Sequence, residues 1–315
     1  MDYGCGISCI DFSKDPKDLI EGSEGWKKLC IQVREACANY GGFRVVYDRV
    51  PDVLHEEMLK GLKELFDLPD EIKMKNSGSV HHGYLGKFEG QPLYESLGIH
   101  NAPILEQAQD FTDLLWPNGN PAFCQTLNSM SKMMQELEGL VRKMIFESLG
   151  VKHYYDSHIK DNDYLFRVMK YSAPFSDDWT LGLSPHTDQD LITILYEDRQ
   201  GLEILSKEGQ WLQVVQQPKT FVVMVGKTLM AWSNGRMHAP KHRVMVKGEK
   251  DRYSYGLFVC LKEGVIVETP TELVDKDHPL LFRPFNYRDY IQYLRANFYL
   301  DSALDTFAGT GGRAV

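Results

Sequence analysis

The sequence lacks the features that mark membrane, secreted or nucleic-acid-binding proteins. None of its 315 residues belongs to an apolar run near the roughly 20 residues of a membrane span. The N-terminus shows neither the basic region nor the apolar region of a signal peptide. The net charge is −9 and no basic cluster is present, which disfavours nucleic acids and anionic membranes as partners. We therefore expect a cytoplasmic protein that binds neither a membrane nor a nucleic acid.

Paired cysteines and repeats are also missing. The 6 cysteines are scattered, without a CxxC pair or a cluster with histidine. This pattern excludes zinc-finger chemistry and is typical of reduced thiols in a cytosolic protein. No internal repeat or low-complexity tract interrupts the chain, and 43% of its residues are hydrophobic. A chain of this length and composition can bury a large core in one domain, with room for an extension.

Helical periodicity is strongest in the first half of the chain. Apolar residues recur at a spacing of about 3.6 residues in 24–40, 53–66 and 123–149, which predicts three amphipathic helices. Residues 76–120 are rich in loops, glycine and aromatic residues, and we interpret them as a wall of a substrate pocket. An aromatic-rich segment at 284–299 predicts a C-terminal helix.

Short β-rich runs dominate the second half. They are separated by glycine and proline turns and cover 166–171, 191–196, 202–205, 211–215, 221–225, 241–246 and 253–261. Two further short strands are expected at 9–12 and 43–47. Many short strands at such spacing are typical of an antiparallel sandwich or barrel. We therefore predict a mainly β protein with a helical N-terminal extension.

Two histidines and an aspartate form the most informative pattern. His186 and Asp188 lie two residues apart and lead into the run 191–196, and residues i and i+2 of an extended chain point to the same face. His242 lies in a later strand-like run. Two imidazoles and one carboxylate on one side of an ion leave the opposite positions open. This is the facial triad that suits non-haem Fe(II) and oxygen chemistry.

A second pair of polar residues predicts a site for a dicarboxylate. Arg252 and Ser254 again show the i, i+2 spacing, at the start of a β-rich run. A guanidinium binds a carboxylate with a rigid fork, and a serine hydroxyl can donate one further hydrogen bond. A dicarboxylate could lie with one end on the metal and the other on this pair. Each motif alone is common by chance, so the hypothesis depends on their combination and order.

Together these motifs resemble the plant 2-oxoglutarate- and Fe(II)-dependent dioxygenases. The pattern of that family is H-x-D, a distal histidine, and R-x-S about ten residues later, as found here for His242 and Arg252. Nearly the whole chain is similar to the family. The stretch 82–98 is similar to the branch with auxin-oxidising dioxygenases and dioxygenases of glucosinolate side chains. The likeness also favours His242 over His238 as the third metal ligand, because Arg-Val-Met-Val follows His242 as in the family.

The resemblance implies a double-stranded β-helix core, which is a cupin-like jelly roll, in a chain of three parts. Residues 1–120 would brace the barrel and form part of the pocket. Residues 121–280 would form the catalytic core with a long support helix. Residues 281–315 would cover the mouth of the active site with a helix and a tail.

It also implies the roles of the site residues. His186, Asp188 and His242 would bind Fe(II) and form the catalytic centre, while Arg252 and Ser254 would hold 2-oxoglutarate.

Tyr171 is similar to the tyrosine of an Asn-x-Tyr motif that helps to hold the cosubstrate in relatives. Met169 stands at the asparagine position, so one hydrogen bond of that motif is lost. Tyr171 can equally be explained as a half-buried aromatic residue of a strand.

The implied enzyme is a 2-oxoglutarate-dependent dioxygenase, an oxidoreductase that consumes O2 and releases succinate and CO2. Its substrate would be a small hydrophobic plant hormone or specialised metabolite, which it would hydroxylate, desaturate or dealkylate. Ascorbate is the expected reductant, and a monomer is the expected state. Two alternatives stay open. One is an ascorbate-type iron oxidase of the same fold that does not use 2-oxoglutarate, and the other is a non-catalytic binder of small molecules.

Overall fold

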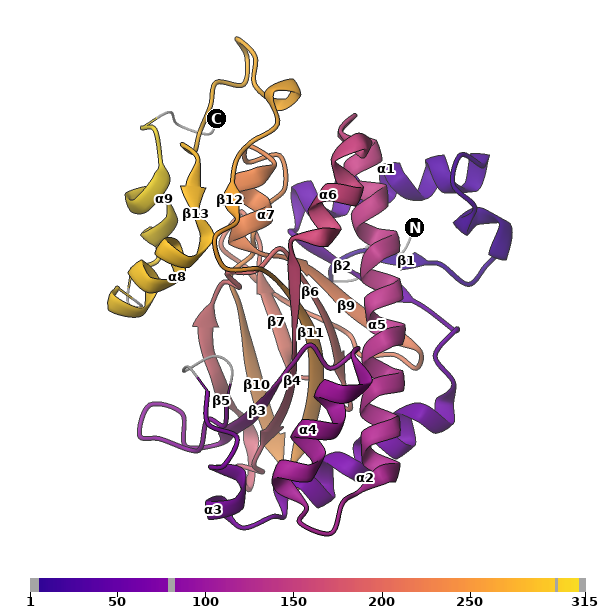
Figure 1. The fold of residues 1–315 in the computed structure, drawn as a ribbon, viewed down its shortest axis with the longest axis vertical. Helices are drawn as coiled ribbons and strands as arrows, with labels where there is room; N and C mark the ends of the chain where they lie inside the picture. The colour runs from indigo at the N-terminus through magenta and orange to yellow at the C-terminus, as the bar shows by residue number, and fades with distance from the viewer. Residues whose placement is uncertain (1–5, 79–82, 298–299, 312–315) are drawn as a thin grey trace.

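A computed structural model of the chain shows two β-sheets that pack face to face, with long helices beside them (Figure 1). The structure describes residues 6–78, 83–297 and 300–311. His82, which begins the stretch 82–98, lies outside these ranges. No helix within them is both long enough and apolar enough to cross a membrane.

The larger sheet has seven strands in the order β1-β2-β9-β6-β11-β4-β3. Its strands are β1 (Cys9–Asp11), β2 (Gly42–Val46), β3 (Tyr94–His100), β4 (Asn162–Tyr171), β6 (Ile192–Glu197), β9 (Thr220–Val225) and β11 (Arg252–Leu261). β1 and β2 pair in parallel, and the other neighbours are antiparallel.

The smaller sheet has four strands in the order β5-β10-β7-β8. They are β5 (Ser176–His186), β7 (Leu202–Leu205), β8 (Trp211–Gln213) and β10 (His242–Gly248). A separate pair of short strands joins β12 (Ile266–Val267) to β13 (Phe285–Asn286). The two facing sheets form the predicted jelly-roll core, so the predicted fold class is confirmed.

Helices flank this core and connect its strands. The α-helices are α1 (Glu24–Asn39), α2 (Asp52–Phe66), α3 (Asp70–Lys73), α4 (Leu105–Leu115), α5 (Pro121–Ser148), α6 (Tyr155–Lys160), α7 (Lys227–Trp232), α8 (Tyr287–Ala296) and α9 (Ala303–Ala308). Short 3-10 turns occur at η1 (Pro16–Leu19), η2 (Lys152–Tyr154) and η3 (Thr271–Leu273). The three helices predicted in the first half of the chain are confirmed as α1, α2 and α5.

The central strands of the larger sheet are buried on both faces. One face packs against the helices, and the other packs against the smaller sheet. On β6, Ile192 and Ile194 belong to the first core, whereas Leu195 belongs to the second. On β9, Phe221 and Val222 divide in the same way. This alternation follows from the two-residue period of a strand, and it determines which polar side chains enter the space between the sheets.

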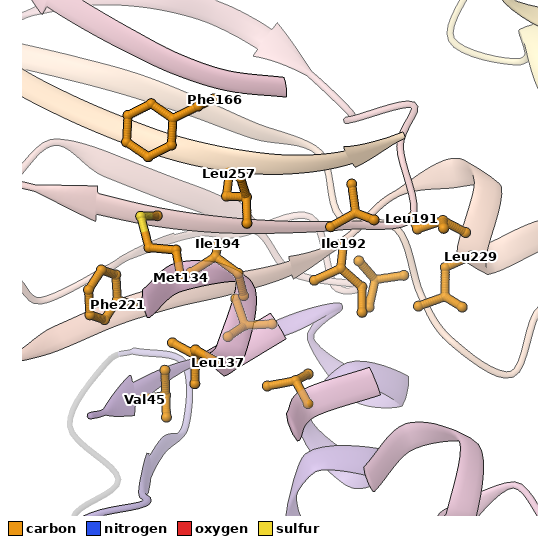
Figure 2. Packing of buried hydrophobic residues seen from close by; sticks show 14 of the residues in the cluster. Val45, Met134, Leu137, Phe166, Leu191, Ile192, Ile194, Phe221, Leu229 and Leu257 are labelled. Atoms are coloured by element: carbon orange, nitrogen blue, oxygen red, sulfur yellow. The ribbon is translucent and has the colours of Figure 1, made fainter. Parts of the chain in front are cut away.

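α5 is the helix that covers most of the larger sheet. Asn120 caps its first turn, with Oδ1 accepting a hydrogen bond of 3.1 Å from the Phe123 amide. Pro121 occupies the first helical position, where a missing N–H removes no hydrogen bond. Met134 and Leu137 then point from the helix to the hydrophobic residues of the strands (Figure 2).

Replacing Leu137 by alanine tests this packing. The side chain is 0% exposed, so we expect the free energy of unfolding to fall by about 2–5 kcal/mol through lost burial and a residual cavity. Leu114→Ala is the control, because Leu114 is 41% exposed and its loss should change stability by no more than about 0.5 kcal/mol. Chemical denaturation measures both variants. Equal stability of the two would contradict the assigned core.

β3, α4 and β5 are among the elements that were not predicted. β3 and α4 lie in residues 76–120, which we expected to be rich in loops and in which we predicted neither a strand nor a helix. β3 has no period-two pattern because six of its seven residues are buried between neighbours. β5 is an edge strand that contains Pro185, and its pairing with β10 has several register shifts. Such strands exist through their partners, not through local propensity.

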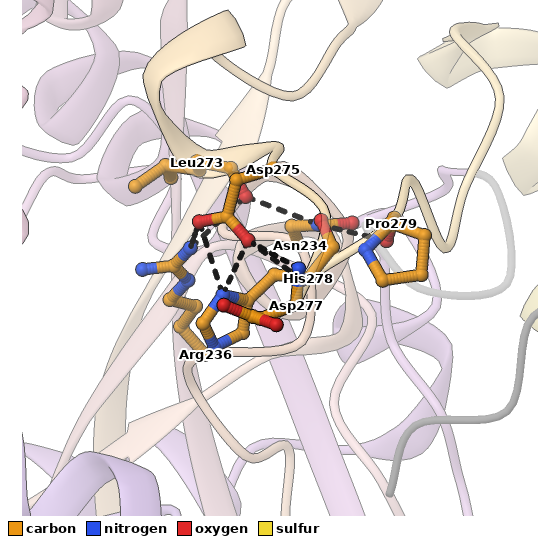
Figure 3. Close-up of polar contacts among 7 residues, drawn as sticks. All are labelled: Asn234, Arg236, Leu273, Asp275, Asp277, His278 and Pro279. Carbon is orange, nitrogen blue, oxygen red and sulfur yellow. Dashed lines mark hydrogen bonds and ion pairs between the residues drawn. The ribbon is translucent and has the colours of Figure 1, made fainter.

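The C-terminal segment begins differently from the expected helix at 284–299. β13 comes first, and α8 starts only at Tyr287, where the Asn286 side chain accepts hydrogen bonds from the next backbone amides. The segment is fastened to the turn after α7 by Asn234, whose Oδ1 accepts from the Leu281 amide at 2.9 Å. Asn234 Nδ2 also donates to backbone carbonyls of the 273–279 loop (Figure 3).

Candidate metal and cosubstrate site

Three side chains converge where β5 ends beside β10. His186 is the last residue of β5 and pairs with His242, the first residue of β10. Asp188 follows in the loop that leads to β6. The Nε2 atoms of His186 and His242 each lie 3.7 Å from Asp188 Oδ1. One ligand atom from each of the three residues lies within 4.8 Å of the others. This spacing suits one metal ion bound by all three.

The backbone orients both imidazoles for metal binding. His186 Nδ1 lies 2.8 Å from the Ser184 carbonyl oxygen, and His242 Nδ1 lies 3.4 Å from that of Pro240. An Nδ1–H that donates to a carbonyl leaves the Nε2 lone pair free, and Nε2 is the atom nearest to Asp188. Burial, with a contribution from His186, lowers the pKa of His242 to about 4. The ring is therefore neutral, as a ligand must be.

Thr193 on β6 orients the carboxylate. Its Oγ1 lies 2.6 Å from Asp188 Oδ2 and 3.1 Å from Asp190 Oδ2. Burial raises the pKa of Asp190 well above its ordinary value, and the Asp188 charge raises it further. A protonated Asp190 can donate to Thr193 while Thr193 donates to Asp188. Asp188 Oδ1 is thereby left to face the two imidazoles.

A Thr193→Val variant should bind Fe(II) about 10- to 100-fold more weakly, as is usual when a hydrogen bond that orients a metal ligand is lost. Thr112→Val is the matched control. Thr112 is also buried, but its hydroxyl donates to the Ala108 carbonyl within α4 at 2.8 Å. Anaerobic Fe(II) titration gives the dissociation constant of each variant. A loss of the same size in both would contradict a role of Thr193 in positioning Asp188.

The three residues predicted to hold the cosubstrate are also brought together. Arg252 and Ser254 lie on β11, and Arg252 pairs in register with Tyr171 of β4. All three are buried. The guanidinium carbon of Arg252 lies 4.8 Å from the centre of the Tyr171 ring. Side chains alternate between the two faces of a strand, and by this alternation these three side chains point into the space between the two sheets.

The distance between the two halves of the site can be read along β6. Thr193, which contacts Asp188, and Glu197, which pairs in register with Ser254, are four residues apart. This corresponds to roughly 13 Å of strand. The separation leaves room for a short dicarboxylate between the metal ligands and Arg252.

Tyr171 and Met169 differ from the pattern of the family. The Tyr171 hydroxyl lies 4.0 Å from Met169 Sδ, a weak acceptor, where relatives have an asparagine. Burial raises the pKa of Tyr171 well above its ordinary value, while Arg252 and Ser254 offset part of that rise. The hydroxyl therefore stays protonated and can donate a hydrogen bond to an anion.

Glu197, the last residue of β6, was not predicted as a site residue from the sequence. Its carboxylate forms a buried ion pair with Arg252, and both side chains are only 3% exposed. A signal was present: Glu197 follows Thr193 and Leu195 at period two, which puts an acidic residue on the interior face of a buried strand.

A basic cavity opens beside Arg252. It has a volume of about 480 Å³, and its charged lining residues are Arg199, Lys247, Lys250 and Arg252. Trp179 also lines it and lies under the Lys247 ammonium, 4.7 Å from the ring centre. A positive lining of this kind raises the local concentration of anions.

His238, the rival third ligand, is placed elsewhere. Its backbone amide donates to the Cys37 carbonyl at 3.0 Å, in the turn before β10. Burial, with the nearby lysines, lowers its pKa to about 4. The cluster with metal-ligand spacing contains His242 instead.

The helix α8 contacts the loop that carries Asp188. Tyr290 of α8 donates a hydrogen bond of 2.6 Å to Gln189 Oε1. Gln189 Nε2 donates to the Thr187 carbonyl, and Thr228 donates to the Gln189 carbonyl, each at 2.6 Å. The loop from Thr187 to Gln189, which carries Asp188, is therefore held by α7 and α8.

Two family models match the chain. One describes the 2OG-Fe(II) oxygenase superfamily and matches residues 147–261. The other describes the N-terminal region of non-haem dioxygenases in morphine synthesis and matches residues 7–118. The first match contains all six residues that were predicted to bind the metal or the cosubstrate.

Several proteins are similar over nearly their whole length. An Arabidopsis thaliana protein named probable 2-oxoglutarate-dependent dioxygenase AOP1 is 41% identical over 313 residues, which is 96% of this chain and 95% of the relative. The crystal structure of a rice dioxygenase for auxin oxidation has a TM-score of 0.81 at 32% identity, covering 96% of this chain and 100% of that one. The Arabidopsis thaliana enzyme AtDAO1, in complex with 2-oxoglutarate, has a TM-score of 0.78 at 29% identity, covering 87% and 99%.

A jelly roll with a His-Asp-His cluster where β5 ends beside β10 is typical of a non-haem iron oxygenase. The chain belongs to the plant 2-oxoglutarate- and Fe(II)-dependent dioxygenases of the 2OG-Fe(II) oxygenase superfamily. The predicted family and its branch with auxin-oxidising and AOP enzymes are confirmed. The protein is thus an oxidoreductase that uses Fe(II) and 2-oxoglutarate.

Proposed function

We propose that His186, Asp188 and His242 bind the Fe(II) ion, and that Arg252 and Ser254 receive the distal carboxylate of 2-oxoglutarate. The hydrogen bonds of the three side chains support the metal site. In each side chain one polar atom is hydrogen-bonded to the surrounding protein, and the other polar atom points to the remaining two residues of the cluster. Fe(II) in such a triad keeps open positions for a chelating cosubstrate and O2.

The main support for the proposed cosubstrate site is a buried hydrogen-bond donor that has no partner. Arg252 Nη1 has no hydrogen-bond partner in the part of the chain that the structure describes, and Ser254 Oγ makes no well-formed hydrogen bond there. Buried donors of this kind are costly unless a partner arrives. A carboxylate that accepts from both atoms satisfies them, and the Tyr171 hydroxyl beside them can donate a third bond.

The residues of the chain then perform distinct tasks. When bound, Fe(II) and 2-oxoglutarate activate O2 and oxidise the substrate, with succinate and CO2 as co-products. Arg252 and Ser254 set the orientation of the cosubstrate, and the two hydrophobic faces of the sheets exclude water from it. His186 is the most exposed ligand, with a side chain 39% exposed, so the substrate approaches the metal from its side.

We infer that the substrate is a small hydrophobic plant hormone or specialised metabolite. The names of the auxin-oxidising structures support this class, and hydroxylation is the default outcome, with desaturation or dealkylation as alternatives. Residues 281–315 would cover the mouth of the site, as the contact between Tyr290 and Gln189 supports. Residues 1–120 would brace the core 121–280, with ascorbate as reductant in a cytoplasmic monomer.

Anaerobic titration with Fe(II) and then 2-oxoglutarate tests the proposal. The expected result is a weak visible charge-transfer band of the chelate, followed by succinate formation when O2 and a panel of indoles, phenolics and other hydrophobic acids are supplied. Bound iron without a band would favour the ascorbate-type oxidase. Absence of iron binding would overturn the assigned triad and favour a non-catalytic binder.

A further inference from the structure

The carboxylate of Glu197 already contacts the guanidinium to which we propose that the cosubstrate carboxylate binds. It lies on the interior face of β6, pairs in register with Ser254, and forms an ion pair with Nη2 of Arg252. Arg252 Nε donates to the Arg199 carbonyl at 3.0 Å. Nη1 is the one guanidinium nitrogen that has no hydrogen-bond partner among the described residues.

The charge of Arg252 is already balanced before a ligand arrives. An incoming carboxylate on Nη1 would place two carboxylates beside one guanidinium in a buried site, with one uncompensated negative charge. Like charges that share a buried site raise the pKa of one group strongly, because only one of them can stay ionised at low cost. Movement of Arg252 from Glu197 to the ligand does not avoid this cost, since it leaves Glu197 buried and unpaired.

Few other charges face Glu197 itself, although Arg199, Lys247 and Lys250 line the cavity beside its partner Arg252. Arg252 faces it from β11, the neutral Tyr171 hydroxyl from β4, and the backbone amide of Leu202 from β7, while Asp198 and the exposed Arg199 follow it in the chain. Burial already raises the pKa of Glu197 above its ordinary value, although Arg252 opposes that rise. Asp198 adds a further negative charge nearby. The surroundings therefore favour protonation of Glu197 once the positive charge of Arg252 is shared with a second carboxylate.

We propose that Glu197 takes up one proton from solvent when the distal carboxylate of 2-oxoglutarate binds to Arg252, so that cosubstrate affinity increases as the pH falls. This inference rests on the proposed function, because it requires 2-oxoglutarate at Arg252. In the bound state the protonated Glu197 still accepts from Arg252 Nη2 through one oxygen. Its other oxygen, Oε1, has no partner among the described residues and can carry the proton.

The direction of the pH dependence follows from linkage. The pKa of Glu197 is higher in the complex than in the free protein, so binding is coupled to proton uptake between the two pKa values. Affinity is independent of pH below the pKa of the free protein and falls by up to about tenfold per pH unit above it, which is the limit for one linked proton. It reaches a new plateau above the pKa of the complex.

Calorimetry of the Fe(II)-loaded protein with 2-oxoglutarate, under anaerobic conditions, measures this directly. Titrations at a series of pH values, in buffers with different ionisation enthalpies, give the number of protons taken up. We expect about one proton for the natural chain within the linked range, and none for Glu197→Gln. The Glu197→Gln variant should also bind 2-oxoglutarate more tightly at the high-pH end and show no pH dependence from this group.

Glu95→Gln is the matched control. Glu95 is a buried carboxylate in an ion pair with Lys73, at 2.8 Å, on the opposite face of the larger sheet. It should leave proton uptake and cosubstrate affinity as in the natural chain. Because proton uptake by the natural chain is measured independently, the test holds even if Glu197→Gln folds poorly.

The outcomes are separable. Binding of 2-oxoglutarate without proton uptake, and with the same pH profile in the natural chain and Glu197→Gln, would overturn the role of Glu197 alone. Absence of 2-oxoglutarate binding at every pH would overturn the proposed function itself.

Discussion

An Asp188→Ala variant is expected to lose stoichiometric Fe(II) binding and all iron-dependent turnover. Asp188 supplies the only carboxylate of the cluster, and its Oδ1 atom is the one that both imidazoles approach. Loss of a direct ligand should weaken metal binding by more than the roughly 100-fold expected for an orienting residue. His186→Ala and His242→Ala should behave in the same way.

Metal content, Fe(II) titration and succinate formation together measure this loss. Asp178→Ala is the matched control, because Asp178 is an exposed residue of β5, the strand that ends at His186. It should bind iron and turn over normally. The decisive comparison is at saturating Fe(II), where normal turnover by Asp188→Ala would exclude the triad as the metal site.

An Arg252→Ala variant should bind 2-oxoglutarate about 10- to 100-fold more weakly while Fe(II) binding is retained. Hydrogen bonds to charged groups contribute about 1.5–3 kcal/mol each, and a change of 1.4 kcal/mol is about tenfold in affinity. Lys250→Ala is the control, because Lys250 lines the same cavity but is exposed. It should change affinity little. The charge-transfer band, recorded over a range of 2-oxoglutarate concentrations, gives both affinities.

The same variant should also lose stability, through Glu197. Removal of one partner of a buried ion pair costs about 3–5 kcal/mol, because the other charge stays buried and unpaired. Without Arg252, burial raises the pKa of Glu197 unopposed. A raised carboxyl pKa means that the folded state binds the proton more tightly, so the loss of stability should grow as the pH rises above the unfolded-state pKa and should be smallest in acid.

The double variant Arg252→Ala, Glu197→Gln separates the two effects. It removes the unpaired charge, so it should recover much of the stability, and the recovered stability should depend less on pH. It should not recover cosubstrate binding. Recovery of both properties would mean that Arg252 acts only as the partner of Glu197, and that the cosubstrate carboxylate binds elsewhere.

The contact between α8 and the loop that carries Asp188 connects the C-terminal segment to the proposed metal site. Tyr290 holds Gln189, and Asn234 fastens the start of the segment to the turn after α7. These contacts link the segment that we propose to cover the mouth to the loop that carries Asp188. They could not be predicted, because each joins residues distant in the chain.

The sequence alone predicted the three residues of the His-Asp-His cluster, the R-x-S pair and the main helices. The His186–Asp188 pair, the R-x-S pair and the helices depend on local spacing: i and i+2 in an extended chain, or a 3.6-residue period that needs no partner to be recognised. His242 was preferred to His238 through the resemblance to the family. His186 and Asp188 were placed together correctly, although His186 ends β5 and Asp188 lies in the following loop, so the pair is not part of one extended strand.

Only the tertiary structure decided which strands pair and which charges meet. β5 has a proline and an irregular register and depends on β10 for its form, and β3 is buried without alternation. The ion pair of Glu197 with Arg252 joins neighbouring strands whose register no local pattern contains. Local periodicity determines the face of the strand on which a side chain lies. Its partner across the sheet depends on how the whole chain folds, because burial between two sheets brings distant residues into contact.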